Sequence, residues 1–313
     1  MKRLWILGVL LAVLAPAADK KKDPDEIGTR DVSKGINFYS LDKELALGKQ
    51  LALEVERQAR MVDDPILGEY INRVGQNLVR NSDARIPVTI KVIDADELNA
   101  FALPGGYVFV NSGLIRVTET EAELAGAMAH EIAHVAARHA TRQQSREQLV
   151  NMATIPLVLL GGWAGFAIQQ GAGLAIPLGF LSFSRGFETE ADLLGLQYMD
   201  KAGYDPTAAV DIFERIEALE LRKPGTIAKV FSSHPMTADR IREAQKNIQE
   251  ILQPKPEYVV NTSEFNDMRW RLIRAHQHQK RQAAESDKPT LRRAPAAGTD
   301  SEPPVLHRLE DFL

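Results

Sequence analysis

The chain has 313 residues, of which 44% are hydrophobic and 26% charged, and its formal net charge is −4. A chain of this length and composition can bury one substantial core, which excludes a chain that is disordered throughout. The mild negative charge provides no extended basic surface and argues against nucleic acid as a partner. Because there is no cysteine, disulfide bonds, thiolate metal ligands and a lipid-modified N-terminal cysteine are excluded.

The N-terminal residues are typical of a secretory signal peptide. Two early positive charges precede an apolar run that ends at Leu14 and is shorter than a membrane span, and an A-x-A motif follows at Ala15 to Ala17. We therefore predict a signal peptide at residues 1–17, secretion across the inner membrane and a periplasmic mature protein. An uncleaved N-terminal anchor is the alternative. The charged, glycine-containing residues 18–40 predict a mobile leader.

Helix and strand patterns follow this leader. Apolar positions at helical spacing predict amphipathic helices at 41–60 and 66–79. Alternating β-branched residues predict a strand at 86–93, and a Pro-Gly-Gly turn at 104–106 leads into a second strand at 107–110. These features favour a small antiparallel sheet.

The second half of the chain is predominantly helical. Residues 119–148 predict one long helix, with Thr118 and Thr120 as candidate N-caps. No charged residue occurs from 148 to 184, where glycine and proline favour a helical hairpin or lid. The segment 149–184 is also a candidate for peripheral membrane contact. Further helices are predicted at 185–202, 205–221 and 238–252, and a polar, disordered tail at 273–313.

The predicted long helix contains the motif His130-Glu131-Ile132-Ala133-His134. Residues four apart lie on one helix face, so the two imidazoles can bind one Zn²⁺ while Glu131 reaches a zinc-bound water. Zinc lowers the pKa of that water toward about 7, and a carboxylate can take its proton and pass it to the leaving amine. Two ordinary surface histidines are the alternative, but the apolar surroundings predict burial, which is costly without a metal.

A catalytic zinc site usually has a third protein ligand. His139 would lie about half a turn from the ligand face of a continuous helix, so it is not predicted as a ligand. Glu188 and Asp192 share a helix face one turn apart, Arg185 lies one turn earlier, and Glu190 points away. Such a helix could supply one carboxylate ligand and a second carboxylate for a ligand imidazole. Asp192 and Arg185 are therefore predicted to lie just outside the metal ligands and to support them. A solvated acidic face remains open as the alternative.

These features together resemble peptidase family M48, in its soluble periplasmic branch. The resemblance covers residues 41–272 and is carried by four ordered blocks: Asn99-Ala100-Phe101-Ala102-Leu103-Pro104-Gly105-Gly106, His130-Glu131-Ile132-Ala133-His134, Ser184-Arg185 with Glu188-Thr189-Glu190-Ala191-Asp192, and Ser233-His234-Pro235.

The resemblance implies an α+β, mostly helical, zincin-like metallopeptidase domain at 41–272, with a small antiparallel sheet and an active-site helix. It also implies one Zn²⁺ per chain, with Glu188 as the third ligand beside His130 and His134. His234, which would otherwise be interpreted as a capping or surface histidine, is expected beside the metal. There it could stabilise an oxyanion, or occupy the open metal position and keep the enzyme latent.

The main functional hypothesis is a zinc metalloendopeptidase (a hydrolase) that cleaves misfolded or misassembled cell-envelope proteins, with Glu131 as catalytic base. Gly106, Tyr107, Val108 and Phe109 are predicted to form an edge strand that holds an extended substrate. One alternative is a largely latent assembly factor that binds clients and cleaves them rarely. Another is an integral membrane peptidase, which would require residues 149–184 to span the bilayer.

Overall fold

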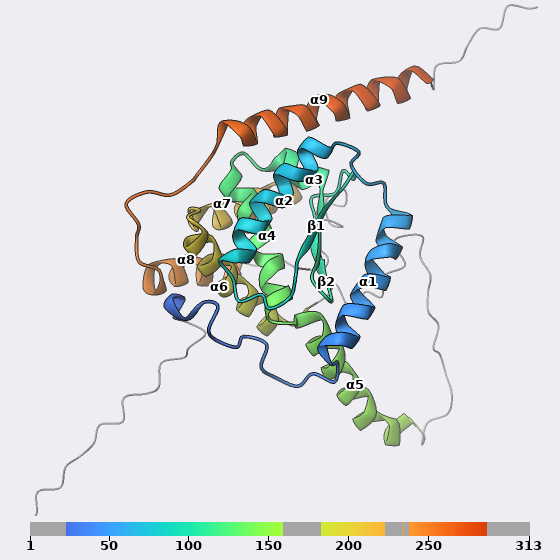
Figure 1. Cartoon of the computed structure of the whole chain (residues 1–313), viewed down its shortest axis with the longest axis vertical. Coiled ribbons are helices and arrows are strands. Elements are labelled where there is room, and N and C mark those ends of the chain that lie inside the picture. The colour runs from blue at the N-terminus through green and yellow to red at the C-terminus, as the bar shows by residue number, and fades with distance from the viewer. Residues whose placement is uncertain (1–22, 159–182, 223–233, 235–237, 287–313) are drawn as a thin grey trace, which may run out of the picture. The chain divides into compact units, whose positions relative to one another are not determined.

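The computed structural model describes residues 23–158, 183–222, 234 and 238–286 (Figure 1). Helix α4 (Glu121–Ala136) lies at the centre of the fold, and all of its residues are buried. Thr120 caps its N-terminus, because the side chain accepts a hydrogen bond from the Glu123 backbone. The helix is buried on every side because α2 (Pro65–Arg80), α6 (Arg185–Ala202) and α7 (Thr207–Arg222) all pack against it.

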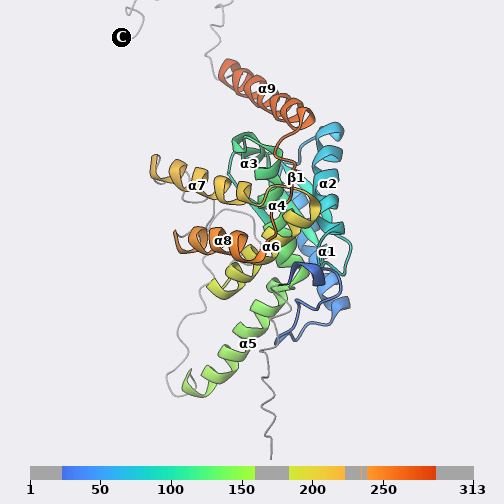
Figure 2. The same cartoon turned by 90° about the vertical axis from the view of Figure 1, so that its left-hand side faces the viewer.

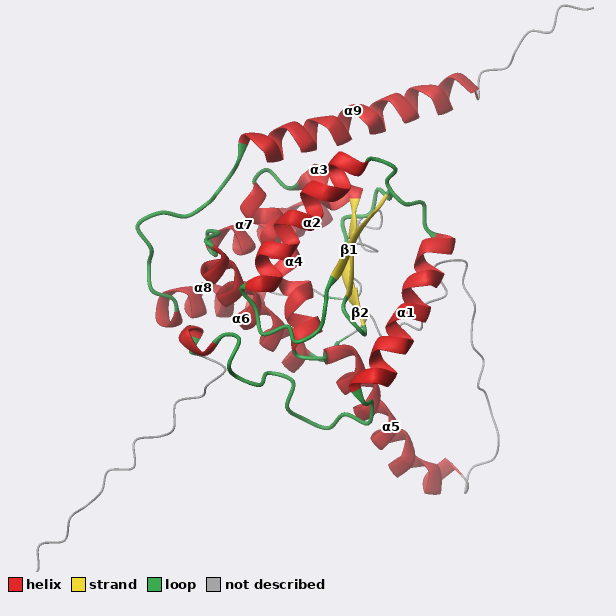
Figure 3. Ribbon diagram, in the orientation of Figure 1, coloured by secondary structure: helices red, strands yellow, loops and turns green. Residues whose placement is uncertain are grey.

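A three-stranded sheet lies between α4 and α1 (Leu41–Gln58), as Figures 1 and 3 show. Its strands are β1 (Thr89–Ile93), β2 (Ala100–Leu103) and β3 (Tyr107–Asn111), in the order β1-β3-β2. Successive side chains point to opposite faces of the sheet, and both faces of β2 and β3 are largely buried. Val108 and Val110 belong to the main core, whereas Phe101 and Phe109 pack with Ala52 and Val55 of α1.

The sheet is mixed, and only part of it has the predicted antiparallel arrangement. The turn at 104–106 joins β2 to β3 as an antiparallel hairpin, while β1 pairs with β3 in parallel. The difference arises because residues 100–103 form a strand of their own and occupy one side of β3. Strand β1 therefore pairs along the other side of β3, and β3 is the central strand.

The predicted helix at 119–148 is interrupted at Ala137 and Arg138. Helix α4 ends at Ala136 and α5 (His139–Val158) begins at His139, because Arg138 adopts a left-handed backbone conformation with φ of 54°. The short helix α3 (Ser112–Val117) precedes α4, and α8 (Ala238–Ile251) packs against α6 and α7, as Figure 2 illustrates.

The leader segment contacts the folded chain along the part that the structure describes. Arg30 is buried and donates hydrogen bonds to Asp83 at 2.9 Å and to Gln197 at 2.6 Å. The backbone N–H of Phe38 donates to Ser145 Oγ at 2.8 Å. The charged composition of residues 18–40 predicts a mobile segment. In the described part, however, the buried charge of Arg30 is stabilised by Asp83, which is distant in sequence.

Helix α9 (Ser263–Ser286) extends past Leu272, so residues 273–286 are helical and the predicted tail begins later. Arg, Gln, Lys and Ala are good helix formers even where apolar periodicity is lacking. The chain divides into two units at Leu272, inside this helix. None of the helices in the described ranges is both long and apolar enough to cross a bilayer. Most of the uncharged segment 149–184 lies outside those ranges.

Candidate metal centre and active site

Two imidazoles of α4 face the same point. His130 and His134 are one helical turn apart, and their Nε2 atoms lie 3.0 Å from each other. Both residues are buried, with exposed fractions of 6% and 2%. The motif that the sequence places on one helix face therefore forms a pair of converging nitrogen atoms.

Helix α6 brings a carboxylate to the same point. The two oxygens of Glu188 lie 3.7 Å from His134 Nε2 and 3.4 Å from His130 Nε2. This approach depends on Gly195, because a Cβ there would lie only 3.2 Å from the backbone nitrogen of His130. The glycine thus lets α6 pack closely enough for Glu188 to reach the histidines.

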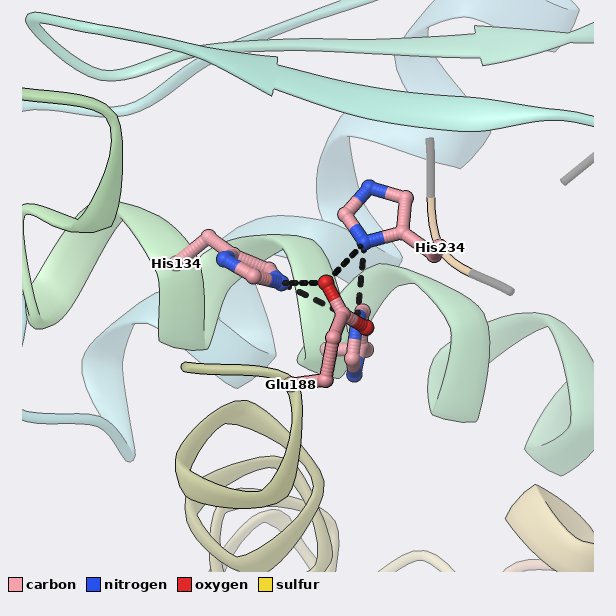
Figure 4. Close-up of side chains that lie close together, drawn as sticks. His134, Glu188 and His234 are labelled. Atoms are coloured by element: carbon pink, nitrogen blue, oxygen red, sulfur yellow. Dashed lines mark hydrogen bonds and ion pairs between the residues drawn. The ribbon is translucent and has the colours of Figure 1, made fainter. Parts of the chain in front are cut away.

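His234 completes the cluster, as Figure 4 shows with His134 and Glu188 pointing toward it. Its Nδ1 lies 2.8 Å from Glu188 Oε1 and 3.4 Å from His130 Nε2. One ligand atom from each of His130, His134, Glu188 and His234 lies within 4.8 Å of the others. A histidine that is far from the motif in sequence is therefore the fourth member of the group.

These donor atoms fit a zinc ion in both spacing and chemistry. Tetrahedral zinc with bonds of about 2.0–2.1 Å separates neighbouring ligand atoms by roughly 3.3 Å. The separations given above, which involve both oxygens of Glu188, run from 2.8 to 3.7 Å, and a set of one atom per residue lies within 4.8 Å. His130 Nδ1 lies 3.0 Å from Asp192 Oδ1, and this contact favours a proton on Nδ1 and a lone pair on Nε2 that faces the cluster. Converging lone pairs and a carboxylate require a cation between them. In the metal-free protein a proton meets this need: burial lowers the pKa of His130, but Asp192 and Glu188 outweigh it and raise that pKa to about 10.

The family model of peptidase family M48 matches residues 65–248, which include all four members of the cluster. This chain belongs to family M48. It is similar to the beta-barrel assembly-enhancing proteases of Yersinia pestis, 31% identical over 83% of this chain and 53% of the relative, and of Escherichia coli K12, 28% identical over 83% and 54%. It is also similar to the mitochondrial metalloendopeptidase OMA1 of Schizosaccharomyces pombe, 34% identical over 66% of this chain and 59% of the relative. The chain spans about half the length of these curated relatives.

In this M48 family member, Asp192 and Glu188 share an arginine that the sequence did not reveal. Arg240 of α8 donates to both oxygens of Asp192 at 2.7 Å, lies 2.9 Å from Glu188 Oε2 and donates to the His234 carbonyl at 3.4 Å. Burial would raise the pKa of Asp192, but hydrogen bonds from Arg240 and His130 hold it below its usual range. Two buried carboxylates on one helix face were the available signal that a cation lies opposite.

The expectation for Arg185 is corrected. Its side chain is exposed at the first position of α6, and among the described residues the guanidinium that bonds Glu188 and Asp192 is that of Arg240. The first turn of α6 points Arg185 to solvent, where it borders a cavity of about 520 Å³ next to Glu188. This cavity is lined by Phe183, Arg185, Glu188, Thr189, Asp192, Asp239, Arg240 and Glu243.

Glu131 lies on the sheet side of the M48 cluster. Its carboxylate Oε1 is 3.6 Å from His234 Nε2, and the backbone of Ala102 in β2 lies beside it. Burial raises its pKa, although the neighbouring imidazoles of His234 and His130 act in the opposite direction. A carboxylate with a raised pKa is suited to accept and return a proton.

The expected edge strand at Gly106 to Phe109 is also corrected. Residues 107–109 belong to β3, which pairs with a strand on each side and has no free backbone edge. The strand beside α4 is β2, and the Asn111 N–H donates to the Asn99 carbonyl. Because antiparallel pairing alternates, the backbone groups of Ala100 and Ala102 point away from β3. The strand that borders Glu131 is thus β2.

Proposed function

We propose that this chain is a zinc-dependent endopeptidase that hydrolyses peptide bonds in misfolded or misassembled cell-envelope proteins. The observation that carries the proposal is the buried cluster of His130, His134, Glu188 and His234, with Glu131 beside it. Relatives named proteases and metalloendopeptidases support peptide-bond hydrolysis, and the name of the assembly-enhancing proteases supports substrates among envelope proteins.

His130, His134 and Glu188 would hold the metal. Bound zinc would supply Lewis acidity, which polarises a substrate carbonyl and lowers the pKa of a water molecule toward about 7. Glu131 would take the proton from that water and return it to the leaving amine, a role that its raised pKa favours. Asp192 would hold the ring of His130, and Arg240 would hold both carboxylates of α6.

We infer that an extended substrate pairs with β2 instead of β3. The outward backbone groups of Ala100 and Ala102 lie on the side of Glu131, and Ala100 lines a small cavity together with Glu131 and His234. Pairing through backbone groups requires a segment without its own secondary structure. The enzyme would therefore select unfolded segments of its substrates, and cleavage would depend little on the side chains of those segments.

A second candidate is a latent assembly factor that binds clients and cleaves them rarely. It is favoured by the fourth donor: if His234 Nδ1 binds the metal, the site has the closed four-ligand set of a structural zinc site. His234 would then need to leave before a substrate carbonyl can approach. The arrangement supports this role for His234 over oxyanion stabilisation, because Nδ1 faces the other donor atoms.

The proposed layout keeps a signal peptide at 1–17, a metallopeptidase domain at 41–272 and a tail that begins after helix α9 ends at Ser286, with the protein in the periplasm. Peripheral membrane contact through 149–184 remains part of the proposal, and most of that segment lies outside the described residues.

The test combines casein cleavage with metal analysis of the purified mature protein. Glu131→Gln should lower the cleavage rate by roughly 10²–10⁴-fold and retain one zinc per chain, whereas Glu69→Gln, an exposed control on α2, should leave both unchanged. His234→Ala should raise the rate if His234 keeps the site closed. A fall of about 10²–10³-fold would instead assign it to oxyanion stabilisation. A wild-type protein without stoichiometric zinc would overturn the proposal, and rescue of envelope defects by Glu131→Gln would favour the assembly factor.

A further inference from the structure

The junction between α4 and α5 determines the position of His139, which differs from the position that helical periodicity predicts. Arg138 has a φ of 54°, a conformation that is unfavourable for a residue other than glycine. Its side chain is held from α1 and the leader, since Nε donates to Glu44 Oε2 at 2.7 Å and Nη2 to the Tyr39 carbonyl at 2.9 Å. The left-handed residue interrupts the helix here, so the position of His139 is not the one that a continuous α4 would give it.

His139 lies against His134 as a result. The Nδ1 atoms of the two rings are 2.9 Å apart, and the rings meet edge to face with their centroids 4.8 Å apart. His139 is fully buried and stacks on Phe187 of α6 with a centroid distance of 4.4 Å. Its other nitrogen, Nε2, is 3.2 Å from Glu190 Oε2. The ring therefore bridges His134 and a carboxylate.

One arrangement of protons satisfies these contacts. His134 directs Nε2 toward the cluster, so its proton is on Nδ1 and is donated to Nδ1 of His139. His139 must then be neutral and carry its own proton on Nε2, which it donates to Glu190. Arg142 Nη1 lies 3.5 Å from the same oxygen of Glu190 and pairs with it.

The two imidazoles of α4 are thus supported from α6 in parallel ways. Asp192 reaches Nδ1 of His130 directly, at 3.0 Å. Glu190, two residues earlier on α6, faces a different direction and reaches Nδ1 of His134 only through His139. Hydrogen bonds of this kind fix the tautomer and orientation of a ligand imidazole and make it more basic.

We propose that His139 is a positioning residue that relays the Glu190 carboxylate to His134 and so sets the affinity and geometry of the metal site. The inference rests on the proposed role of His134 as a metal ligand. It assigns a function to a histidine that is outside the H-E-x-x-H motif and does not itself belong to the four-member cluster.

The test uses two variants that differ in which contact they keep. In His139→Asn, the amide oxygen can occupy the place of Nδ1 and accept from His134. In His139→Gln, the longer side chain carries its amide toward the place of Nε2 and Glu190. Both are polar and neutral, and both remove the ring that stacks on Phe187, so they match in their structural cost. Zinc affinity of the full mature chain is measured by competition with a chelator, alongside the visible d–d absorption of the cobalt(II)-substituted protein.

We expect His139→Gln to weaken zinc binding by roughly 10–100-fold and to change the cobalt bands, while His139→Asn stays within about threefold of wild type. Glu190→Leu, which leaves the ring in place, should also weaken zinc binding. Equal affinities for the Asn and Gln variants, or wild-type affinity in Glu190→Leu, would overturn the inference. Failure of the wild-type protein to bind zinc would instead overturn the proposed function, so the two failures are distinguishable.

Discussion

Replacing Arg240 with methionine would remove the cation that two buried carboxylates share. The guanidinium contacts both oxygens of Asp192 at 2.7 Å and Glu188 at 2.9 Å, and its side chain is 9% exposed. Glu188 and Asp192 are themselves only 4% and 6% exposed at their side chains. Methionine keeps much of the apolar stem, so the loss is chiefly electrostatic.

Breaking a buried ion pair by removal of one partner costs about 3–5 kcal/mol, because the remaining charge stays buried without compensation. For a domain of this size each kcal/mol lowers Tm by roughly 2–4 °C, which gives a fall of roughly 6–20 °C. Arg240→Lys keeps the charge but loses the two-point contact with Asp192, so its Tm should lie between those of the wild type and Arg240→Met.

The measurement is thermal unfolding of the mature chain in the presence of a chelator, so that metal binding does not contribute. The matched control is Arg242→Met on the same helix, because Arg242 pairs with Asp239 at the surface, where the two side chains are 69% and 84% exposed. Such exposed pairs contribute about 0–1 kcal/mol. If Arg240→Met lowered Tm no more than Arg242→Met does, the electrostatic reasoning about this cluster would be refuted.

Two further predictions concern backbone positions. Gly48→Ala would place a Cβ 1.9 Å from the carbonyl oxygen of Pro104, so we expect the free energy of unfolding to fall by about 1–3 kcal/mol. Gly68→Ala meets nothing within 4 Å and should raise the free energy of unfolding by about 0.5–1 kcal/mol. Urea denaturation measures both changes, and equal effects would contradict the packing argument. Ala102→Pro removes an N–H that points away from β3 on the side of Glu131, where the substrate is proposed to pair, so casein cleavage should fall roughly tenfold or more while zinc content and Tm stay near wild type. Unchanged cleavage would show that β2 does not contribute this donor to catalysis.

Local sequence was sufficient for the parts of this protein that depend on near neighbours. Helical periodicity predicted α1, α2, α6, α7 and α8, and Thr120 is the N-cap of α4, one of the two candidates at that position. The spacing of His130 and His134 fixes their relative direction because both belong to one helix. The four ordered sequence blocks that resemble family M48 predicted the family, and the match of the family model over residues 65–248 confirms it.

Tertiary structure decided what depends on groups distant in the chain. The left-handed Arg138 is held by Glu44, which is 94 residues away, and without that contact the periodicity predicts an uninterrupted helix that turns His139 away from His134. Strand order was likewise decided by which segment occupies each side of β3, and alternation within one strand carries no information on its neighbours. The role of Arg240 could not be assigned from the sequence. Arg240 is buried because it pairs with two carboxylates, and these lie on a different helix that is distant in the chain.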